Sequence, residues 1–207
     1  AFVERELQMA RQIQDGLVPR TLHIEGLDVA IGYEPCRWVG GDYVDIVPMP
    51  DGRILLAIAD VCGKGLQAAL VASSLHTMVH ATIDAGGNLS QLIQSCNTYL
   101  CSYLPEHSFV TMMLVAIDTM SGELEVVNAG HPPAFAVSPD GRVRQLQSER
   151  NVALGMMETR MEMERSMLIG NELLVLYSDG LTEMVDENQV ALGEERLSAH
   201  LADIVQR

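Results

Sequence analysis

The chain has 207 residues, 48% of them hydrophobic, and a formal net charge of −15 at pH 7. This length and composition predict one substantial domain with a hydrophobic core and argue against intrinsic disorder. The acidic balance argues against nucleic acid or an anionic membrane as a partner, because both bind positively charged surfaces.

The four cysteines, Cys36, Cys62, Cys96 and Cys101, include no Cys-x-x-Cys pair. The sequence therefore predicts neither a cysteine-based zinc site nor a disulfide framework. Reduced thiols are usual in cytoplasmic proteins, which is the location we expect. No apolar run approaches the roughly 18 residues of a membrane span, so we expect none in this chain.

Residues 2–17 are predicted to form a helix, because Val3, Leu7, Ala10, Ile13 and Leu17 recur at spacings of three and four. The proline at position 19 disfavours a helical conformation just before it and ends the helix. The apolar stripe fits either a coiled-coil seam or a helix that lies on its own domain. Because the chain begins inside this pattern, we expect it to be part of a longer protein.

Weak alternation predicts a strand at 27–34, and two further strands are predicted at 42–47 and 53–60. The Asp51-Gly52 pair between the last two is typical of a hairpin turn, so these strands are expected to pair antiparallel. Antiparallel pairing brings Asp42, at the start of one strand, next to Asp60, at the end of the other. Two carboxylates from neighbouring strands are therefore expected at one end of a sheet.

The other predicted elements are helices at 66–85, 89–104 and 194–206, and strands at 109–118, 123–128, 135–137, 143–146 and 173–177. His76 and His80 are four residues apart on the first of these helices. This spacing fits metal ligands or, more often, a helix surface, and the glutamate of a His-Glu-x-x-His zinc motif is missing. Three methionines between 160 and 167 are predicted to pack in the core; they are Met161, Met163 and Met167.

Asp42, Asp60 and Asp179 share a pattern, in which a carboxylate next to glycine lies at the end of an apolar strand. The two other Asp-Gly pairs, at 51–52 and 140–141, lie between strands and are explained as turns. Mg²⁺ and Mn²⁺ prefer oxygen ligands, and a bound cation removes the repulsion between gathered carboxylates. Two such ions about 3.5–4 Å apart can activate water and polarise a phosphoryl group.

Three other sites fit less well. Residues 63–68 match G-x-G-x-x-A, but a dinucleotide site needs parallel βαβ units, and the flanking strands here are joined by tight hairpins. A cysteine phosphatase loop starting at Cys62 would need arginine at position 68, which is Ala68. A phosphate-binding P-loop would need Ser or Thr after Lys64, where Gly65 stands.

Four motifs occur in order, and they are VGGDYVD (39–45), ADVCGKG (59–65), VNAGHPP (127–133) and YSDGLTE (177–183). Together they resemble the metal-dependent (PPM, type 2C) protein serine/threonine phosphatases, in the bacterial branch named for the sporulation phosphatase SpoIIE. The likeness runs from about residue 6 to residue 197. It implies an α/β (α+β) fold, a four-layer α-β-β-α sandwich of two antiparallel sheets flanked by helices.

By this resemblance, Asp42, Asp60 and Asp179 match catalytic metal ligands, and the carbonyl of Val61 matches a backbone ligand. Asp45 resembles a neighbouring group that supports the ligands. The implied cofactor is Mn²⁺ or Mg²⁺, as two ions. The implied reaction is hydrolysis of phosphoserine or phosphothreonine by metal-activated water, in a regulatory phosphoprotein such as an anti-sigma-factor antagonist.

Residues 1–19 resemble the helical linker that joins such domains to an upstream sensor or receiver module, and homodimerisation through this helix is expected. Residues 20–207 are then the phosphatase domain. One departure is that the family's further aspartate, in an Asp-Asp-x-Thr stretch near the C-terminus, has no counterpart before Arg207. This leaves open either a domain without its last strand or an incomplete second metal site. The second case predicts a non-enzymatic or weakly active regulatory domain of the same fold.

Overall fold

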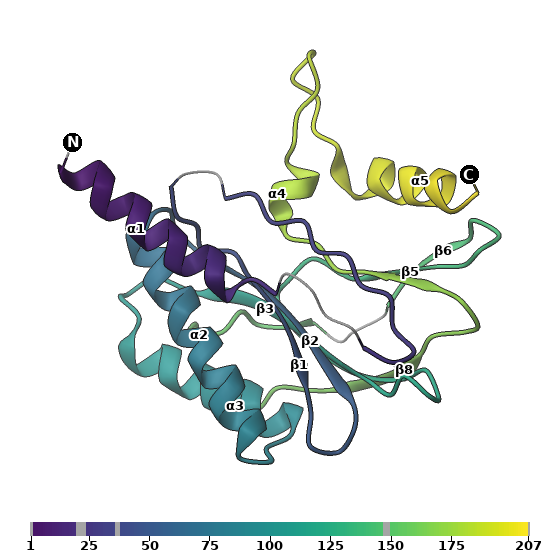
Figure 1. Cartoon of the computed structure of the whole chain (residues 1–207), viewed down its shortest axis with the longest axis horizontal. Helices are drawn as coiled ribbons and strands as arrows, with labels where there is room; N and C mark the ends of the chain where they lie inside the picture. The colour runs from purple at the N-terminus through teal and green to yellow at the C-terminus, as the bar shows by residue number, and fades with distance from the viewer. Residues whose placement is uncertain (1, 20–23, 36–37, 147–149, 207) are drawn as a thin grey trace.

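The computed structural model describes residues 2–19, 24–35, 38–146 and 150–206, and Figure 1 shows the course of the chain. The helices are α1 (Phe2–Leu17), α2 (Leu66–Asp84), α3 (Leu89–Tyr103), α4 (Asp179–Thr182) and α5 (Gly193–Val205). The strands are β1 (Tyr43–Pro48), β2 (Ile54–Val61), β3 (Val110–Ile117), β4 (Glu123–Ala129), β5 (Phe135–Val137), β6 (Val143–Gln145), β7 (Arg150–Asn151), β8 (Glu164–Met167) and β9 (Leu173–Val175). The four longer helices were all predicted from the sequence. None of the described helices is long and apolar enough to cross a membrane.

Two sheets form the centre of the fold. The larger has the order β1-β2-β3-β4-β7, with β8 also paired to β4, and the smaller has the order β6-β5-β9. All pairs are antiparallel except the short β4–β7 pair. Helices α2 and α3 cover one face of the larger sheet, the smaller sheet covers the other, and α5 packs on the outer side of the smaller sheet (Figure 1). The predicted α-β-β-α sandwich is therefore confirmed.

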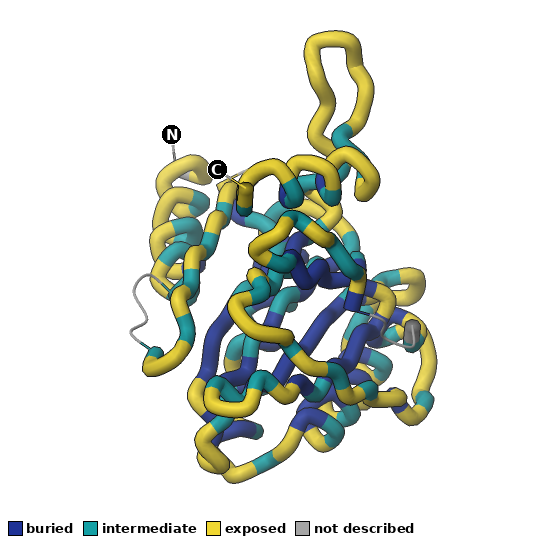
Figure 2. The backbone as a smooth tube through the Cα atoms, turned by 90° about the vertical axis from the view of Figure 1, so that its right-hand side faces the viewer, coloured by how far each residue is buried: buried dark blue, intermediate teal, exposed yellow. Residues whose placement is uncertain are grey.

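Alternation along β2 assigns its side chains to two different cores. Leu55 and Ala59 belong to the core beneath α2 and α3, whereas Ile54 belongs to the core between the sheets. Figure 2 shows buried segments of the chain running through the centre of the molecule. Because side chains alternate between the faces of a strand, Asp60 follows the row that faces the smaller sheet. Strand β1 alternates in the same way, with Tyr43 on the helix side and Ile46 between the sheets.

The turn after β2 depends on two glycines with positive φ. Gly63 has φ +104° and Gly65 has φ +78°, values that residues with a side chain rarely adopt. Gly65 is also the residue that precedes the first turn of α2. The chain can therefore leave the Asp60 end of β2 and enter a helix within a few residues.

Helix α1 packs beside α2 through one face (Figure 1). Only part of its predicted apolar stripe is buried there. Leu7, Ala10 and Leu17 are partly buried, whereas Val3 and Ile13 are each 68% exposed. The buried polar residue on this helix is Gln14, whose side-chain amide donates to the Gly40 carbonyl (2.8 Å) and accepts from the Gly40 N–H (3.0 Å). The end of α1 is thereby fixed to the glycine turn before β1.

The predicted strand at 27–34 is wrong. Leu27 forms an isolated bridge with Ile24, and residues 28–34 belong to no strand. Leu27, Val29 and Ile31 nevertheless pack on the core between the sheets. Alternating apolar residues indicate an extended chain with one buried side, but they do not show that its backbone pairs with another strand.

Two details near the C-terminal half also differ from prediction. Met161 is buried, but Met163 and Met167 are exposed, so core packing is wrong for these two. They lie at or just before β8, whose outer side chains at Arg165 and Met167 face solvent. The strand predicted at 173–177 is confirmed but shorter, because its ladder ends at Val175.

Candidate metal centre

The predicted pairing of β1 and β2 is confirmed, with Tyr43 opposite Ala59. One step further along this register, Asp42 lies opposite Asp60. Both side chains belong to the rows that face the smaller sheet, since Ile46 and Ile54 on the same strands pack there. The hairpin thus places two carboxylates at one edge of the space between the sheets.

A third carboxylate comes from the segment that follows the smaller sheet. Asp179 is the first residue of the short helix α4, which follows β9 closely. Burial raises the pKa of Asp60 to about 6, and the negative charges of Asp42, Asp179 and Glu183 add to this effect, while Lys64 opposes it. The charges of the three predicted ligand side chains therefore act on one another, although Asp42 and Asp60 belong to the β1–β2 hairpin and Asp179 to the helix after the smaller sheet.

The carboxyl group of Asp42 has a similar environment. Burial raises its pKa, a hydrogen bond from the Ser178 side chain opposes the rise, and the charge of Asp179 adds to it. Ser178 thus links the chain before α4 directly to the start of β1. Three carboxylates therefore act on Asp60, and the one positive charge among the described residues that acts on it is Lys64. Such an excess of negative charge attracts a divalent cation.

These aspartates do not form the tightest potential ligand group. In the described residues, the group of three whose ligand atoms all lie within 4.8 Å of one another is Asp45, His76 and His80. Carboxylates alone repel one another, and a centre for two ions about 3.5–4 Å apart spreads its ligand atoms more widely than a single-ion site. We expected Asp45 to support the predicted ligands. Instead, it belongs to the helix side of β1 and does not contact the Asp42–Asp60 pair.

Sequence reasoning did not assign Ser178, Glu183 or Lys64 to this site. All three lie inside the motifs YSDGLTE and ADVCGKG, beside the predicted aspartates. Their position in the sequence could have suggested them. Their direct effect on Asp42 or Asp60 depends on how the two sheets meet, which the local sequence does not specify.

Gly41 lets the turn before β1 lie against the end of β2. A Cβ atom at this position would lie 2.7 Å from the Val61 carbonyl oxygen and 3.1 Å from the Ala68 Cβ. The Val61 N–H also donates to the Gly41 carbonyl, at 3.3 Å. A side chain at position 41 would therefore displace the Val61 carbonyl, the predicted backbone ligand.

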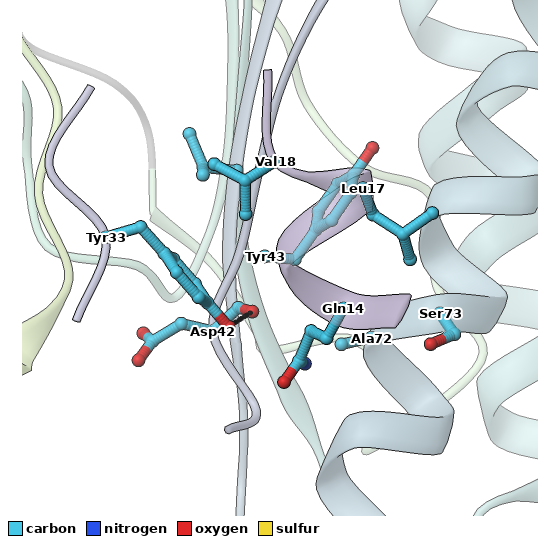
Figure 3. Close-up of a pocket in the computed structure, with 9 residues that line it drawn as sticks. Gln14, Leu17, Val18, Tyr33, Asp42, Tyr43, Ala72 and Ser73 are labelled. Atoms are coloured by element: carbon cyan, nitrogen blue, oxygen red, sulfur yellow. Dashed lines mark hydrogen bonds between the residues drawn. The ribbon is translucent and has the colours of Figure 1, made fainter. Parts of the chain in front are cut away.

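A small pocket lies between the end of α1, α2 and the start of β1 (Figure 3). It is lined by Gln14, Leu17, Val18, Tyr33, Asp42, Tyr43, Val44, Ala72 and Ser73. The Tyr33 hydroxyl donates to the Asp42 backbone carbonyl at 3.4 Å, and burial, followed by the charges of Asp42 and Asp15, raises the pKa of Tyr33 to about 12. Residues of α1 and of the site thus line one pocket.

Residues 50–207 match the family of stage II sporulation protein E (SpoIIE). The chain belongs to the SpoIIE family. The family assignment made from the four motifs is therefore confirmed.

Several proteins of known name are similar to this SpoIIE-family chain. Protein IcfG of Synechocystis is 28% identical over 221 residues, covering 93% of this chain and 35% of its own length. Phosphoserine phosphatases RsbU and RsbP of Bacillus subtilis are 26% and 27% identical. They cover 90% and 87% of this chain, which spans 56% and 46% of their lengths. The chain thus spans between a third and just over half of these relatives.

Solved structures agree with the observed fold. The RsbU and RsbW domains of a Mycobacterium tuberculosis protein match with a TM-score of 0.72 and 26% identity, covering 89% of this chain and 55% of that one. The SiaA PP2C domain of Pseudomonas aeruginosa matches with a TM-score of 0.79 and 21% identity, covering 97% and 82%. The second likeness supports the fold alone.

In this SpoIIE-family domain, His131 of the VNAGHPP motif joins the two sheets near the aspartates. Its Nε2 donates to the Tyr177 carbonyl (3.1 Å), so its Nδ1 is the acceptor for the Thr111 hydroxyl (2.9 Å). Thr111 lies opposite Asp60, and Tyr177 is two residues before Asp179. Burial lowers the pKa of His131 to about 4, although the bond to Tyr177 opposes the shift, so the ring is neutral at pH 7. A neutral imidazole therefore ties the strand beside Asp60 to the segment that carries Asp179.

Proposed function

We propose that this protein is a metal-dependent phosphatase that hydrolyses phosphoserine or phosphothreonine in a regulatory phosphoprotein. The observation that carries the proposal is the electrostatic proximity of Asp42 and Asp60, from the β1–β2 hairpin, to Asp179, from the helix after β9, in a SpoIIE-family domain. The two relatives named phosphoserine phosphatases support the same activity.

Asp42, Asp60, Asp179 and the Val61 carbonyl would hold the metal, as two ions of Mn²⁺ or Mg²⁺. All of these donors are oxygens, as such hard cations require. Burial, and after it the negative charge of neighbouring carboxylates, raises the pKa of Asp42 and of Asp60, and a cation would offset that charge. When bound, such ions acidify water and polarise a phosphoryl oxygen.

The remaining residues of the site would position these ligands. The Ser178 side chain fixes the Asp42 carboxylate by its hydrogen bond, and His131 holds the segment before Asp179 through the Tyr177 carbonyl. Lys64, which is exposed beside Asp60, offers a positive charge to an incoming phosphoryl group. We propose direct hydrolysis by water, with no covalent phosphoenzyme.

The test is turnover of a chromogenic phosphate ester and of a serine-phosphorylated protein, with added Mn²⁺ and then with a chelator. Asp60→Asn and Asp179→Asn should each lower metal-dependent turnover about 100-fold or more, because each removes a charged ligand. Asp51→Asn is the matched control, since Asp51 is an exposed turn residue paired with Arg53. A comparable loss in Asp51→Asn, or a trapped phosphoenzyme, would contradict the proposal.

For the substrate, we propose a small serine-phosphorylated protein of the anti-sigma-factor-antagonist type. Support comes from the likeness to the phosphoserine phosphatases RsbU and RsbP and to a structure that contains RsbU and RsbW domains. Phosphoproteins of this type from the same cell should lose phosphate in the presence of the protein and Mn²⁺. If none of them does, while the chromogenic ester is still hydrolysed, the substrate class is wrong and the activity stands.

We also propose that residues 1–19 are a linker from an upstream sensor or receiver module, and that residues 20–207 are the phosphatase domain. The two hydrogen bonds between Gln14 and Gly40 support a link from this helix to the site, because Asp42 is two residues beyond Gly40. The exposed apolar side chains of Val3 and Ile13 support pairing with a second copy of the helix. The free thiols of Cys62, Cys96 and Cys101 support a cytoplasmic location.

A further inference from the structure

Asp45, His76 and His80 form a compact cluster between β1 and α2, on the side of β1 that faces the helices. The Asp45 side chain is only 4% exposed, and its Oδ2 atom lies 3.0 Å from His76 Nδ1 and 2.9 Å from His80 Nε2. The two histidines are one helical turn apart on α2, and their ring centroids are 4.4 Å apart. One carboxylate oxygen and two imidazole nitrogens thus converge on one point.

The surrounding groups hold the Asp45 carboxylate in this orientation. The Tyr43 hydroxyl donates to Oδ2 (2.9 Å), and the Ile46 N–H donates to Oδ1 (2.8 Å). Hydrogen bonds of this kind to a carboxylate commonly orient it as a metal ligand. The carboxylate is therefore fixed before any ligand arrives.

His76 has a buried nitrogen that the cluster does not satisfy. Its Nδ1 is buried and lies close to Asp45 Oδ2, but the two atoms are not aligned for a hydrogen bond, and the described residues offer this nitrogen no other hydrogen-bond partner. A buried polar atom without a partner costs free energy, so its presence requires an explanation. Coordination of a cation by the Nδ1 lone pair would supply one.

We propose that Asp45, His76 and His80 form a second metal site, for a divalent cation of the zinc class. Two imidazoles and one carboxylate are a common ligand set for Zn²⁺, whereas Mg²⁺ prefers oxygen ligands alone. Zinc bonds of about 2.0–2.1 Å to N and O place neighbouring ligand atoms roughly 3.3 Å apart in a tetrahedron. The two distances from Asp45 Oδ2 are shorter than this by a few tenths of an ångström, so small side-chain movements suffice.

The site is distinct from the aspartate cluster in both place and chemistry. Asp45 is on the helix side of β1, whereas Asp42 and Asp60 are in the rows that face the smaller sheet. The imidazoles of His76 and His80 are 24% and 40% exposed, which gives a cation access and leaves room for water as a fourth ligand. A bound ion would join β1, which follows Asp42, to α2, which follows Asp60.

The test is titration of the protein with Zn²⁺ by calorimetry, in millimolar Mg²⁺ so that oxygen-only sites are occupied. The wild-type protein should bind one Zn²⁺ with at least micromolar affinity. His80→Gln and His76→Gln should each weaken binding by at least roughly tenfold, the loss that is typical even for groups that only support a ligand. His200→Gln, on the exposed surface of α5, is the matched control and should bind as the wild type does.

Two further measurements distinguish Zn²⁺ binding at this site from metal binding at the aspartates and from an effect of misfolding in the variants. Asp60→Asn should keep the same Zn²⁺ affinity, because Asp60 takes no part in the cluster. In the wild-type protein, the ring signals of His76 and His80 should shift on addition of one equivalent of Zn²⁺, and those of His200 should not. Absence of Zn²⁺ binding by the wild type, wild-type affinity in both His76→Gln and His80→Gln, or loss of binding in Asp60→Asn would each overturn the proposal.

Discussion

The charged carboxylate of Asp60 destabilises the folded protein when no metal is bound. Burial and the charges of Asp42, Asp179 and Glu183 raise its pKa to about 6, so the folded state binds a proton here more readily than the unfolded chain. At neutral pH the group is ionised in both states, and the shift therefore lowers the free energy of unfolding. The shift corresponds to at most about 3 kcal/mol, and about 1–2 kcal/mol after allowance for screening by solvent.

Asp60→Asn should therefore stabilise the metal-free protein, although we expect the same change to lower metal-dependent turnover. In a chelator at pH 7, the free energy of unfolding should rise by about 1–2 kcal/mol, which is a rise in Tm of about 2–8 °C for a domain of this size. Stabilisation by added Mn²⁺ should shrink, because it follows affinity. Thermal melts with and without Mn²⁺ measure both effects. A lower Tm in chelator than the wild type would contradict the repulsion argument, and Asp51→Asn should show no gain.

Gly41 is required by a close approach rather than by its backbone conformation. Gly41→Ala would place a Cβ atom 2.7 Å from the Val61 carbonyl oxygen. We expect a loss of about 1–3 kcal/mol in the free energy of unfolding and weaker binding of Mn²⁺, because the displaced carbonyl is a proposed ligand. Denaturant unfolding and Mn²⁺ calorimetry test this. Gly16→Ala has no atom within 4 Å of the new Cβ and should leave Mn²⁺ binding unchanged.

The lowered pKa of the buried His131 imidazole predicts that the stability of the protein depends on pH. Its pKa falls from 6.5 in the unfolded chain to about 4 in the folded protein, so its contribution is complete above pH 6.5 and is lost as the pH falls towards 4. The loss amounts to about 3 kcal/mol. Asp60 acts in the opposite direction over a similar range, because its folded-state pKa is raised. The contribution of His131 must therefore be measured as a difference between variants.

His131→Gln, which cannot gain a proton, should remove this part of the acid destabilisation. Urea unfolding at pH 7 and pH 4.5 should show a smaller loss of stability in the variant than in the wild type, even though the variant is less stable at pH 7. His200→Gln should keep the wild-type difference. Equal losses in His131→Gln and the wild type would show that the imidazole is not held neutral by burial.

Among the elements, α1 has the contact most relevant to control of the site. Gln14 satisfies both the N–H and the carbonyl of Gly40, two residues before Asp42. A helix of 16 residues is marginal alone in water, so its position depends on contacts such as these. A displacement of α1 would therefore act first on the turn that carries Asp42.

Gln14→Leu should remove the hydrogen bonds between α1 and this turn, while a side chain of similar size that favours the helix stays at position 14. Losing two hydrogen bonds and leaving the Gly40 backbone unsatisfied should cost about 1–3 kcal/mol of unfolding free energy. Affinity for Mn²⁺ should fall as well, because the Asp42 turn loses its support. Gln12→Leu is the matched control, since Gln12 is exposed on the same helix. Unchanged Mn²⁺ affinity in Gln14→Leu would show that α1 only packs on the domain.

At the scale of the whole molecule, the exposed side of α1 is the surface best suited to pairing with a second copy. Val3 and Ile13 are each 68% exposed, whereas Leu7 of the predicted stripe is partly buried against the domain. A Val3→Ser/Ile13→Ser double variant should therefore weaken self-association without loss of monomer stability. Sedimentation of the wild type and the variant over a range of concentrations measures this. The same oligomeric state in both would exclude this side of α1 as the interface.

The sequence by itself determined the features that local chemistry controls. Apolar periodicity specified the helices, and the Asp51-Gly52 turn specified the β1–β2 hairpin, so the juxtaposition of Asp42 and Asp60 could be predicted from one turn and two strands. The motifs around these residues were also sufficient to assign the family. These inferences succeed because hairpin register and helix faces depend on residues close together in the chain.

Only the tertiary structure decided how distant segments combine. Asp179 joins the other aspartates because the smaller sheet packs on the larger one, and Ser178 and Glu183 arrive with it. Asp45 turns away from them towards His76 and His80, because successive side chains of a strand point to opposite faces and α2 covers one of those faces. Residues 28–34 belong to no strand although apolar side chains of this segment pack on the core between the sheets, because burial of one side of an extended chain does not require its backbone to pair.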